Sequence, residues 1–314
     1  MSRDFPGEAG RDRLRSALEQ ALAEGRRHVN RGKVAAYIPP LARADPDALG
    51  AAIALPGGEV VAAGDCRHPF TLQSVSKVFS LLLALERLGP GAVFSRVGME
   101  PTGDPFNSVL RLELAEPPRP LNPMINAGAV AVCGLLVEQL GPGSFGELVE
   151  LVRAAAQSGS VDVDEEVYLA EKETGHRNRA LAYFLKDLGV LRAGVEETLD
   201  YYFRQCALRV TCVDLARMGL FLAAPPGSPA PVCRELIRMV NAFMVTCGMY
   251  NGSGEFAVRA GIPAKSGVSG AVMAVVPGRL GVGVYGPALE SRGNSVGGVE
   301  LLVALSRRLD WSVF

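Results

Sequence analysis

Histidine is scarce in this sequence, and no cysteine pair has the spacing of a metal site. The 314 residues include three histidines, which stand far apart (His28, His68 and His176), and six cysteines without any C-x-x-C pair. Zinc sites usually draw on Cys and His ligands at short, regular spacings. We expect the scattered cysteines to be small buried hydrophobic residues of a reducing compartment. The sequence therefore predicts neither a metal nor an organic cofactor.

Net charge and long apolar runs are also lacking. Lys plus Arg number 32 and Asp plus Glu number 33, which gives a formal net charge of -1. A balance of this kind offers no broad basic surface to nucleic acid or anionic lipid. Residues 1–30 mix charges of both signs without the apolar stretch of a secretory signal, and no run of about eighteen apolar residues could span a membrane. We expect a cytoplasmic protein whose partners are a small molecule and further copies of itself.

Strands are predicted near both ends of the chain and helices between them. Apolar residues make up 48% of the sequence, enough for one large core or two smaller ones. Short or alternating apolar runs predict strands at 34–38, 50–55, 59–63, 270–276 and 280–285. Helical spacing of apolar residues predicts helices at 12–28, 73–88, 126–140, 144–157, 165–173, 177–188, 195–206, 212–223, 232–244 and 294–309. The helix at 73–88 should end at Gly89-Pro90, and Ser144 followed by Glu147 has the pattern of a capping box.

This order of elements predicts a mixed α/β (α+β) fold. An antiparallel sheet built from N- and C-terminal segments would be flanked by helices and would carry an inserted all-helical domain. We expect residues 1–29 to form an N-terminal helical segment, residues 30–89 together with 245–314 a sheet-containing catalytic domain, and residues 90–244 the helical domain. Ligand pockets tend to form where domains meet, so the active site is expected at their junction.

An S-x-x-K pattern, Ser74-Val75-Ser76-Lys77, stands at the start of the predicted helix 73–88. Residues three apart on a helix share a face, so the lysine can serve as the base that a serine nucleophile needs, and an apolar setting lowers the pKa of a lysine for that task. Unpaired N–H groups at a helix N-terminus can also stabilise an oxyanion. Alone, the tetrapeptide more often means a helix cap followed by a solvated lysine, but its apolar neighbours argue against solvation.

A second motif strengthens the prediction of a serine hydrolase. Lys265-Ser266-Gly267 precedes the predicted strand 270–276 and matches the K-T-G-type triad that accompanies S-x-x-K in serine penicillin-recognising enzymes. An isolated K-S-G would be a basic turn leading into a strand. With both motifs in order, the residues indicate amide cleavage through a covalent acyl-enzyme.

Further motifs occur in the order of one family. They are Tyr37-Ile38-Pro39, Gln73 with Ser74 to Lys77, Pro105-Phe106-Asn107-Ser108, Asn122 to Ala129, Glu171 with Arg177-Asn178-Arg179-Ala180, Tyr202 to Cys206, Cys247-Gly248-Met249-Tyr250, and Lys265 to Gly270. From about residue 30 to the C-terminus, the chain resembles the serine-dependent glutaminases. The resemblance implies a serine β-lactamase/penicillin-binding-like fold, hydrolysis of L-glutamine to L-glutamate and ammonia, and a homodimer or homotetramer.

The resemblance also implies a role for each matching residue. Ser74 would be the nucleophile, Lys77 its proton-transfer partner and Tyr250 a general base beside it. The backbone N–H groups of Ser74 and Val268 would form the oxyanion hole. The substrate-binding residues would be Ser74, Asn126, Glu171, Asn178, Tyr202, Tyr250 and Val268, with Tyr37 a further pocket-lining residue. Taken singly, most of these have an ordinary explanation as a helix cap, a solvated helix residue or a core aromatic.

Two other functions share part of this pattern. A β-lactamase or transpeptidase would also use Ser74, Lys77 and Lys265, but such enzymes act outside the cytoplasm. A non-catalytic amino-acid-binding module would keep the pocket without turnover, which the set Ser74, Lys77 and Tyr250 disfavours. The G-x-G-x-x-G at 281–286 lies within a predicted strand, so it does not indicate nucleotide binding.

Overall fold

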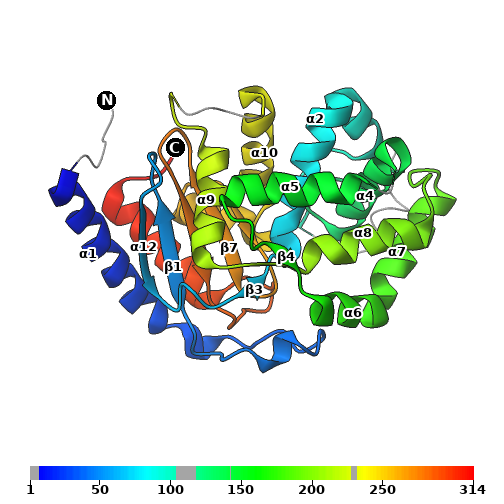
Figure 1. The fold of residues 1–314 in the computed structure, drawn as a ribbon. Coiled ribbons are helices and arrows are strands. Elements are labelled where there is room, and N and C mark those ends of the chain that lie inside the picture. The colour runs from blue at the N-terminus through cyan, green and yellow to red at the C-terminus, as the bar shows by residue number, and fades with distance from the viewer. Residues whose placement is uncertain (1–6, 104–117, 142, 228–231) are drawn as a thin grey trace.

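A five-stranded sheet lies beside a group of helices (Figure 1). The computed structural model describes residues 7–103, 118–141, 143–227 and 232–314. The strands are all antiparallel, in the order β2-β1-β8-β7-β6. Their bounds are β1 Gly50–Ala54, β2 Val60–Gly64, β6 Ala264–Ser266, β7 Ala271–Val276 and β8 Leu280–Tyr285. Segments from both ends of the chain meet in this sheet, which confirms the predicted antiparallel arrangement.

Both faces of the sheet are covered by helices. Successive residues of a strand point to opposite faces. In β1, Ala51 and Ile53 belong to an apolar cluster with α1 (Gly7–Arg26) and α12 (Val296–Leu309), whereas Ala52 belongs to a second cluster that includes α9. Because neither face meets water, the inner strands β1, β7 and β8 are apolar along their whole length.

Glycines in β8 let α9 (Cys212–Ala223) pack directly on the strand. A Cβ at Gly281 would lie 2.0 Å from the Leu220 nitrogen, and a Cβ at Gly283 would lie 2.3 Å from the Cys212 carbonyl oxygen. Neither distance is sterically possible, so both positions require glycine. The G-x-G-x-x-G pattern is therefore explained by packing of a helix against a strand.

The helices between the sheet-forming segments agree with the predicted ranges to within a few residues. They are α4 Asn126–Leu140, α5 Ser144–Ala156, α6 Glu165–Thr174, α7 His176–Asp187, α8 Val195–Cys206 and α10 Arg234–Cys247. Sequence reasoning missed the short helix α11 Ser253–Arg259 and a small sheet of β3 (Phe70–Thr71), β5 (Leu208–Val210) and β4 (Asp162–Val163). Short 3-10 turns occur at η1 Val29–Arg31, η2 Leu41–Arg43, η3 Gln73–Val75 and η4 Tyr250–Gly252.

The buried helix α2 (Ser76–Arg96) is longer than predicted. The backbone does break at Gly89, which has φ 81°, but helical turns resume and reach Arg96. By length and hydropathy, the described part of the chain has one single helix that could cross a membrane, Gln73–Arg96 with a mean hydropathy of 1.4, and one bent pair, α4 with α5. This segment passes on mean hydropathy although Ser, Lys, Glu, Arg, Gly and Pro residues interrupt its apolar run. The side chains from Ser76 to Leu85 are all buried within the protein, against α4, α5 and α10 among others, which explains the apolarity of α2.

Two local predictions were wrong, and a third was incomplete. Residues 34–38 form a loop, since only Lys33 makes a β-bridge, to Leu289, and Pro39-Pro40 cannot extend a strand ladder. Ser144 does not cap α5, because it already lies within the helix and donates its hydroxyl to the Gly141 carbonyl oxygen at 2.7 Å. Lys265-Ser266-Gly267 precedes the strand β7 as predicted, but Lys265 and Ser266 themselves belong to a further strand, β6, that was not predicted.

The cysteines agree in part with expectation. All six are free; Cys133, Cys206, Cys212 and Cys247 are buried, but Cys66 is partly buried and Cys233 is exposed. Two large apolar clusters occupy the two faces of the sheet, and the one on the α9 face runs on into the helices around α2. The division into residues 1–29, 30–89 with 245–314, and 90–244 stays a prediction.

Candidate active site

Ser74 lies in the 3-10 turn η3 that leads into α2. The turn starts sharply, because Gln73 adopts a φ of 48°, a conformation that a non-glycine residue rarely takes. Ser74 is 7% exposed, so its hydroxyl lies at the edge of the core. Ser76 is fully buried and donates its hydroxyl to the Gln73 carbonyl oxygen at 2.7 Å. Of these two serines, only Ser74 borders the large cavity described below.

Lys77, one turn further along, is buried with neutral acceptors. Its Nζ donates to the Asn126 Oδ1 at 2.7 Å and to the Met124 carbonyl oxygen at 3.2 Å. Burial lowers the pKa of Lys77 from 10.5 to about 8, although nearby groups, Glu171 among them, oppose the shift. A lysine of this pKa is neutral often enough near neutral pH to accept a proton.

Tyr250 approaches Ser74 from the turn η4 after α10. Its φ is 51°, so it is a second non-glycine residue in the left-handed region, which costs about 1 kcal/mol or more. Burial raises the pKa of Tyr250, and a side-chain hydrogen bond with Ser74 opposes that rise. The Nζ of Lys265 lies 4.6 Å from the centroid of the Tyr250 ring. The pKa of Lys265 is well below its usual value, through burial and through repulsion from Lys77. Tyr250 thus lies near both Ser74 and Lys265.

Gly267 brings the end of β6 against the Ser74 turn. A Cβ at this position would lie 2.6 Å from the Leu72 carbonyl oxygen and 3.5 Å from the Ser74 nitrogen. The loop is tied down by Ser269, whose hydroxyl donates to the Thr71 carbonyl oxygen at 2.6 Å. Among the described residues, neither the Ser74 nor the Val268 amide donates a hydrogen bond. Two such amides beside a nucleophile have the chemistry of an oxyanion hole.

A cavity of about 210 Å³ opens above Ser74. Its lining residues are Tyr37, Ile38, Gln73, Ser74, Asn126, Glu171, Thr174, Gly175, Arg177, Asn178, Tyr202, Cys206 and Val268. All seven substrate-binding candidates other than Tyr250 are in this set, Tyr37 included. Tyr250 lines a separate cavity of about 20 Å³ with Met124 and Cys247, and Lys77 lies beneath Asn126. The structure thus brings together residues that are far apart in the sequence.

The amino-acid-binding candidates form a connected polar wall. Glu171 is buried and accepts a hydrogen bond from the Gln73 Nε2 at 2.8 Å. Burial raises the pKa of Glu171 to about 7, and Gln73 and Lys77 oppose this rise. Asn126 accepts from Lys77 and donates its Nδ2 to the Asn178 Oδ1 at 3.1 Å. A carboxylate and neutral amides on one wall suit a ligand that carries an ammonium group and a carboxylate.

Several lining residues were not singled out from the sequence. Gln73, Arg177 and Cys206 stand inside the motifs that carried the resemblance, so the signal was present but no role was assigned. Gly175 joins α6 to α7; a Cβ there would meet the Glu171 carbonyl oxygen at 2.6 Å. The motif Pro105-Phe106-Asn107-Ser108 lies outside the described residues. Within the described ranges, no three His, Cys, Asp or Glu side chains are placed to hold a metal ion.

Comparison with known proteins places this geometry in one family. The family model "Glutaminase" matches residues 32–314. "Glutaminase 1" of Halalkalibacterium halodurans is 50% identical over 301 residues, which cover 95% of this chain and 98% of that protein. The solved structure of a probable glutaminase, ybaS, has a TM-score of 0.89 at 36% identity, covering 96% of this chain and 98% of the other. A covalent complex of the Bacillus subtilis glutaminase YbgJ with 5-oxo-L-norleucine, formed from 6-diazo-5-oxo-L-norleucine, has a TM-score of 0.82 at 35% identity, with coverages of 95% and 98%.

Proposed function

The chain belongs to the glutaminase family, has its β-lactamase-like fold and hydrolyses L-glutamine to L-glutamate and ammonia, and we propose that the reaction proceeds through a γ-glutamyl ester on Ser74. The observation that carries the proposal is the meeting of Ser74 with Tyr250 and Lys77. Ser74 lies close enough to the Tyr250 phenol to oppose the rise that burial causes in its pKa, and Lys77 follows one helical turn later, buried among neutral acceptors.

In the first half-reaction, the Ser74 Oγ attacks the side-chain carbonyl carbon of glutamine. Neutral Lys77 accepts the hydroxyl proton, and the Tyr250 phenol, which burial keeps protonated, relays a proton to the departing nitrogen. The Oγ–C bond forms, the C–N bond breaks and ammonia leaves. The amides of Ser74 and Val268 stabilise the intermediate oxyanion. Water then attacks the ester and gives a proton to the Tyr250 phenolate, which acts as the general base of this step. The Lys77 ammonium returns its proton to the Ser74 Oγ as the ester bond breaks and glutamate leaves.

The polar wall of the cavity holds the amino-acid end of the substrate. The Glu171 carboxylate pairs with the substrate ammonium, and Asn126, Asn178 and Tyr202 supply neutral hydrogen-bonding groups. Tyr37 and Val268 close the cavity around the side chain. The covalent complex of the Bacillus subtilis glutaminase YbgJ with 5-oxo-L-norleucine supports the covalent step of the proposal, because a glutamine-like compound is bonded to that protein.

The remaining parts of the proposal follow the family resemblance. We propose that the protein acts in the cytoplasm as a homodimer or homotetramer. No nucleic acid, membrane or cofactor takes part in the mechanism, which needs only protein groups and water.

Partition of the acyl-enzyme between water and hydroxylamine tests the proposal. If glutamine and γ-glutamyl-p-nitroanilide pass through one ester on Ser74, both should give the same ratio of γ-glutamyl hydroxamate to glutamate at a given hydroxylamine concentration. The two products are measured by chromatography after matched extents of reaction. Absence of hydroxamate, or ratios that differ between the two donors, would rule out a shared covalent intermediate.

Glu171→Gln should lower kcat/KM by about 30- to 1,000-fold, or about 2 to 4 kcal/mol, because a desolvated ammonium loses its charge partner. The amide oxygen of the introduced glutamine can still accept a hydrogen bond from Gln73, so the polar wall keeps its shape.

The pH dependence of kcat/KM gives a second test of Glu171. In the parent enzyme both Glu171, with a pKa of about 7, and Lys77, with a pKa of about 8, must lose a proton. Log kcat/KM should therefore rise with a slope of about two below pH 7, and with a slope of about one in the variant. Equal slopes in the two enzymes would remove Glu171 from ammonium binding.

A further inference from the structure

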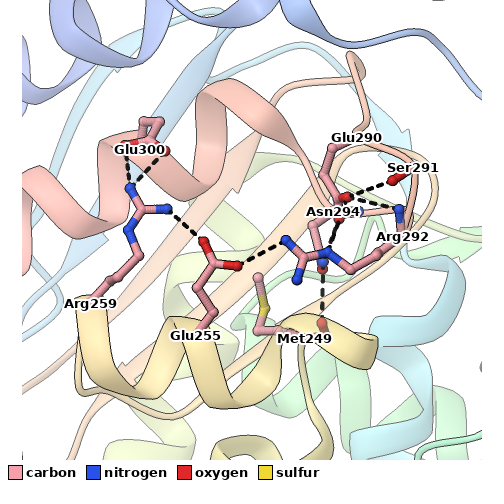
Figure 2. A network of polar contacts seen from close by, with 8 residues as sticks. All are labelled: Met249, Glu255, Arg259, Glu290, Ser291, Arg292, Asn294 and Glu300. Carbon is pink, nitrogen blue, oxygen red and sulfur yellow. Dashed lines mark hydrogen bonds and ion pairs between the residues drawn. The ribbon is translucent and has the colours of Figure 1, made fainter. Parts of the chain in front are cut away.

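A loop between β8 and α12 packs against the turn that carries Tyr250. The loop, Glu290–Asn294, closes on itself through hydrogen bonds from the Glu290 nitrogen to the Asn294 carbonyl oxygen and from the Gly293 nitrogen to the Glu290 carbonyl oxygen, both 2.9 Å. Figure 2 shows Asn294 pointing toward Met249 and Arg292 pointing toward Glu255 in the helix α11. A Cβ added to Gly252, at the end of the turn, would lie 3.3 Å from the Asn294 Nδ2, so the two segments are in contact.

Asn294 reaches the backbone next to Tyr250. Its Nδ2 donates to the Met249 carbonyl oxygen at 3.2 Å and to the Glu290 Oε1 at 2.9 Å. Both partners are acceptors, which fixes the orientation of the side-chain amide with its NH₂ group toward them. Asn294 is only 4% exposed, and its Oδ1 is buried without a hydrogen-bond partner among the described residues. The side chain therefore keeps this place at the cost of one unpaired acceptor.

The same loop passes beside the Tyr250 ring. A Cβ on Gly293, which has φ 97°, would lie 3.4 Å from the Cε2 of Tyr250 and 3.7 Å from the Val268 Cγ1. The turn is bonded internally, since the Ser253 hydroxyl donates to the Tyr250 carbonyl oxygen at 2.8 Å. On its loop side, however, the turn borders a cavity of about 190 Å³. The Met249 carbonyl oxygen accepts one hydrogen bond within the turn, from the Gly252 nitrogen at 2.9 Å, and one from the loop, from the Asn294 Nδ2 at 3.2 Å. The bond from Asn294 is therefore the one that ties this carbonyl to the loop.

A chain of charges anchors the loop to two helices (Figure 2). Glu290 accepts from the Arg292 backbone nitrogen at 2.8 Å and from its Nε at 3.2 Å, and Arg292 Nη2 pairs with Glu255 at 3.0 Å. Glu255 in α11 pairs in turn with Arg259 at 3.3 Å, and Arg259 pairs with Glu300 in α12 at 2.7 Å. The loop is thereby fixed relative to the element that follows Tyr250.

We infer that Asn294 is a positioning residue for Tyr250, which holds the strained turn so that the phenol meets Ser74. The inference rests on the proposed role of Tyr250 in proton transfer. A non-glycine residue at a φ of 51° persists only where surrounding contacts hold it, and Asn294 supplies the contact to the Met249 carbonyl that comes from outside the turn. The role of Asn294 is thus to place the phenol, while the residue itself touches no substrate.

Asn294→Ala should lower kcat by about tenfold or more with KM changed less than about twofold, since the amino-acid wall is untouched. In a Tyr250→Phe background, the same change should cost less than about twofold, because a ring without a hydroxyl has no proton-transfer geometry to lose. Ser291→Ala, in the same loop with an exposed hydroxyl, is the matched control and should keep the parent rate. Asn294→Asp removes the NH₂ donor without a cavity, and it replaces the alanine variant if that one does not fold.

The outcomes separate the inference from the function that it deepens. Equal losses in the parent and in the Tyr250→Phe background would show that Asn294 acts through something other than the phenol and would overturn the inference. Parent activity in both Asn294 variants, with a large loss in Tyr250→Phe, would overturn the inference and leave the proposed function intact. Parent activity in Tyr250→Phe would overturn both.

Discussion

Ser74→Ala should lower kcat for glutamine hydrolysis by about 10³-fold or more, because no ester can form without the hydroxyl. Binding should persist, since the amides, Glu171 and the asparagines of the cavity remain in place. Calorimetric titration with glutamine, alongside ammonia release, separates these two effects. A Kd within a few-fold of the parent KM, together with the lost turnover, is the expected result.

Ser76→Ala is the matched control for this prediction. Ser76 is also a buried serine two positions away, but its hydroxyl is bound to the Gln73 carbonyl oxygen and does not border the cavity. Residues two apart on a helix face different directions. Ser76→Ala should therefore stay within about threefold of the parent. Parent-level turnover by Ser74→Ala, or a comparable collapse in Ser76→Ala, would contradict the assignment of the nucleophile.

Lys77→Met should also lower kcat by about 10³-fold, because the variant has no base to take the Ser74 proton. Methionine fills a similar volume, so the buried site keeps its packing. In the parent, kcat/KM should rise as pH passes the pKa of Lys77 at about 8, since only the neutral amine accepts a proton. That part of the pH profile should disappear in the variant. Because the two groups act as a unit, the double variant Ser74→Ala with Lys77→Met should be little slower than either alone.

A full additional loss in the double variant would mean that Lys77 and Ser74 serve separate steps. Circular dichroism and thermal unfolding of each variant provide the folding control, since removal of a buried charge with good hydrogen bonds can destabilise a protein by itself.

Local sequence patterns correctly predicted those helices and strands whose packing is of the same kind along their whole length. The helices α4, α8 and α9 and the strand β8 begin and end at the predicted residues. The prediction was wrong where a neighbour distant in sequence decides the conformation. Residues 34–38 read as a strand, but only Lys33 pairs, and Tyr37 instead lines the cavity. Spacing alone cannot show that a segment lacks a partner strand.

The sequence predicted residues that line the cavity, but it did not predict the backbone conformation that positions them. Motifs in family order gave the side chains of the cavity wall, since each type suits the chemistry of an amino-acid amide. The strained backbone at Gln73 and Tyr250 has no sequence signal, because glutamine and tyrosine seldom adopt positive φ. The contact of Asn294 with this turn could not be predicted from the sequence either, since its partner is a backbone carbonyl 45 residues away. Such contacts depend on the tertiary structure and not on the local sequence.

Covalent labelling with 6-diazo-5-oxo-L-norleucine tests the central claim most directly. The protein is treated with the reagent, digested and examined by tandem mass spectrometry. The mechanism predicts one 5-oxo-norleucyl group per chain, located on Ser74, with no labelling of the Ser74→Ala variant. A group located on Ser76, on Cys206 in the cavity wall or on any other residue would contradict the account.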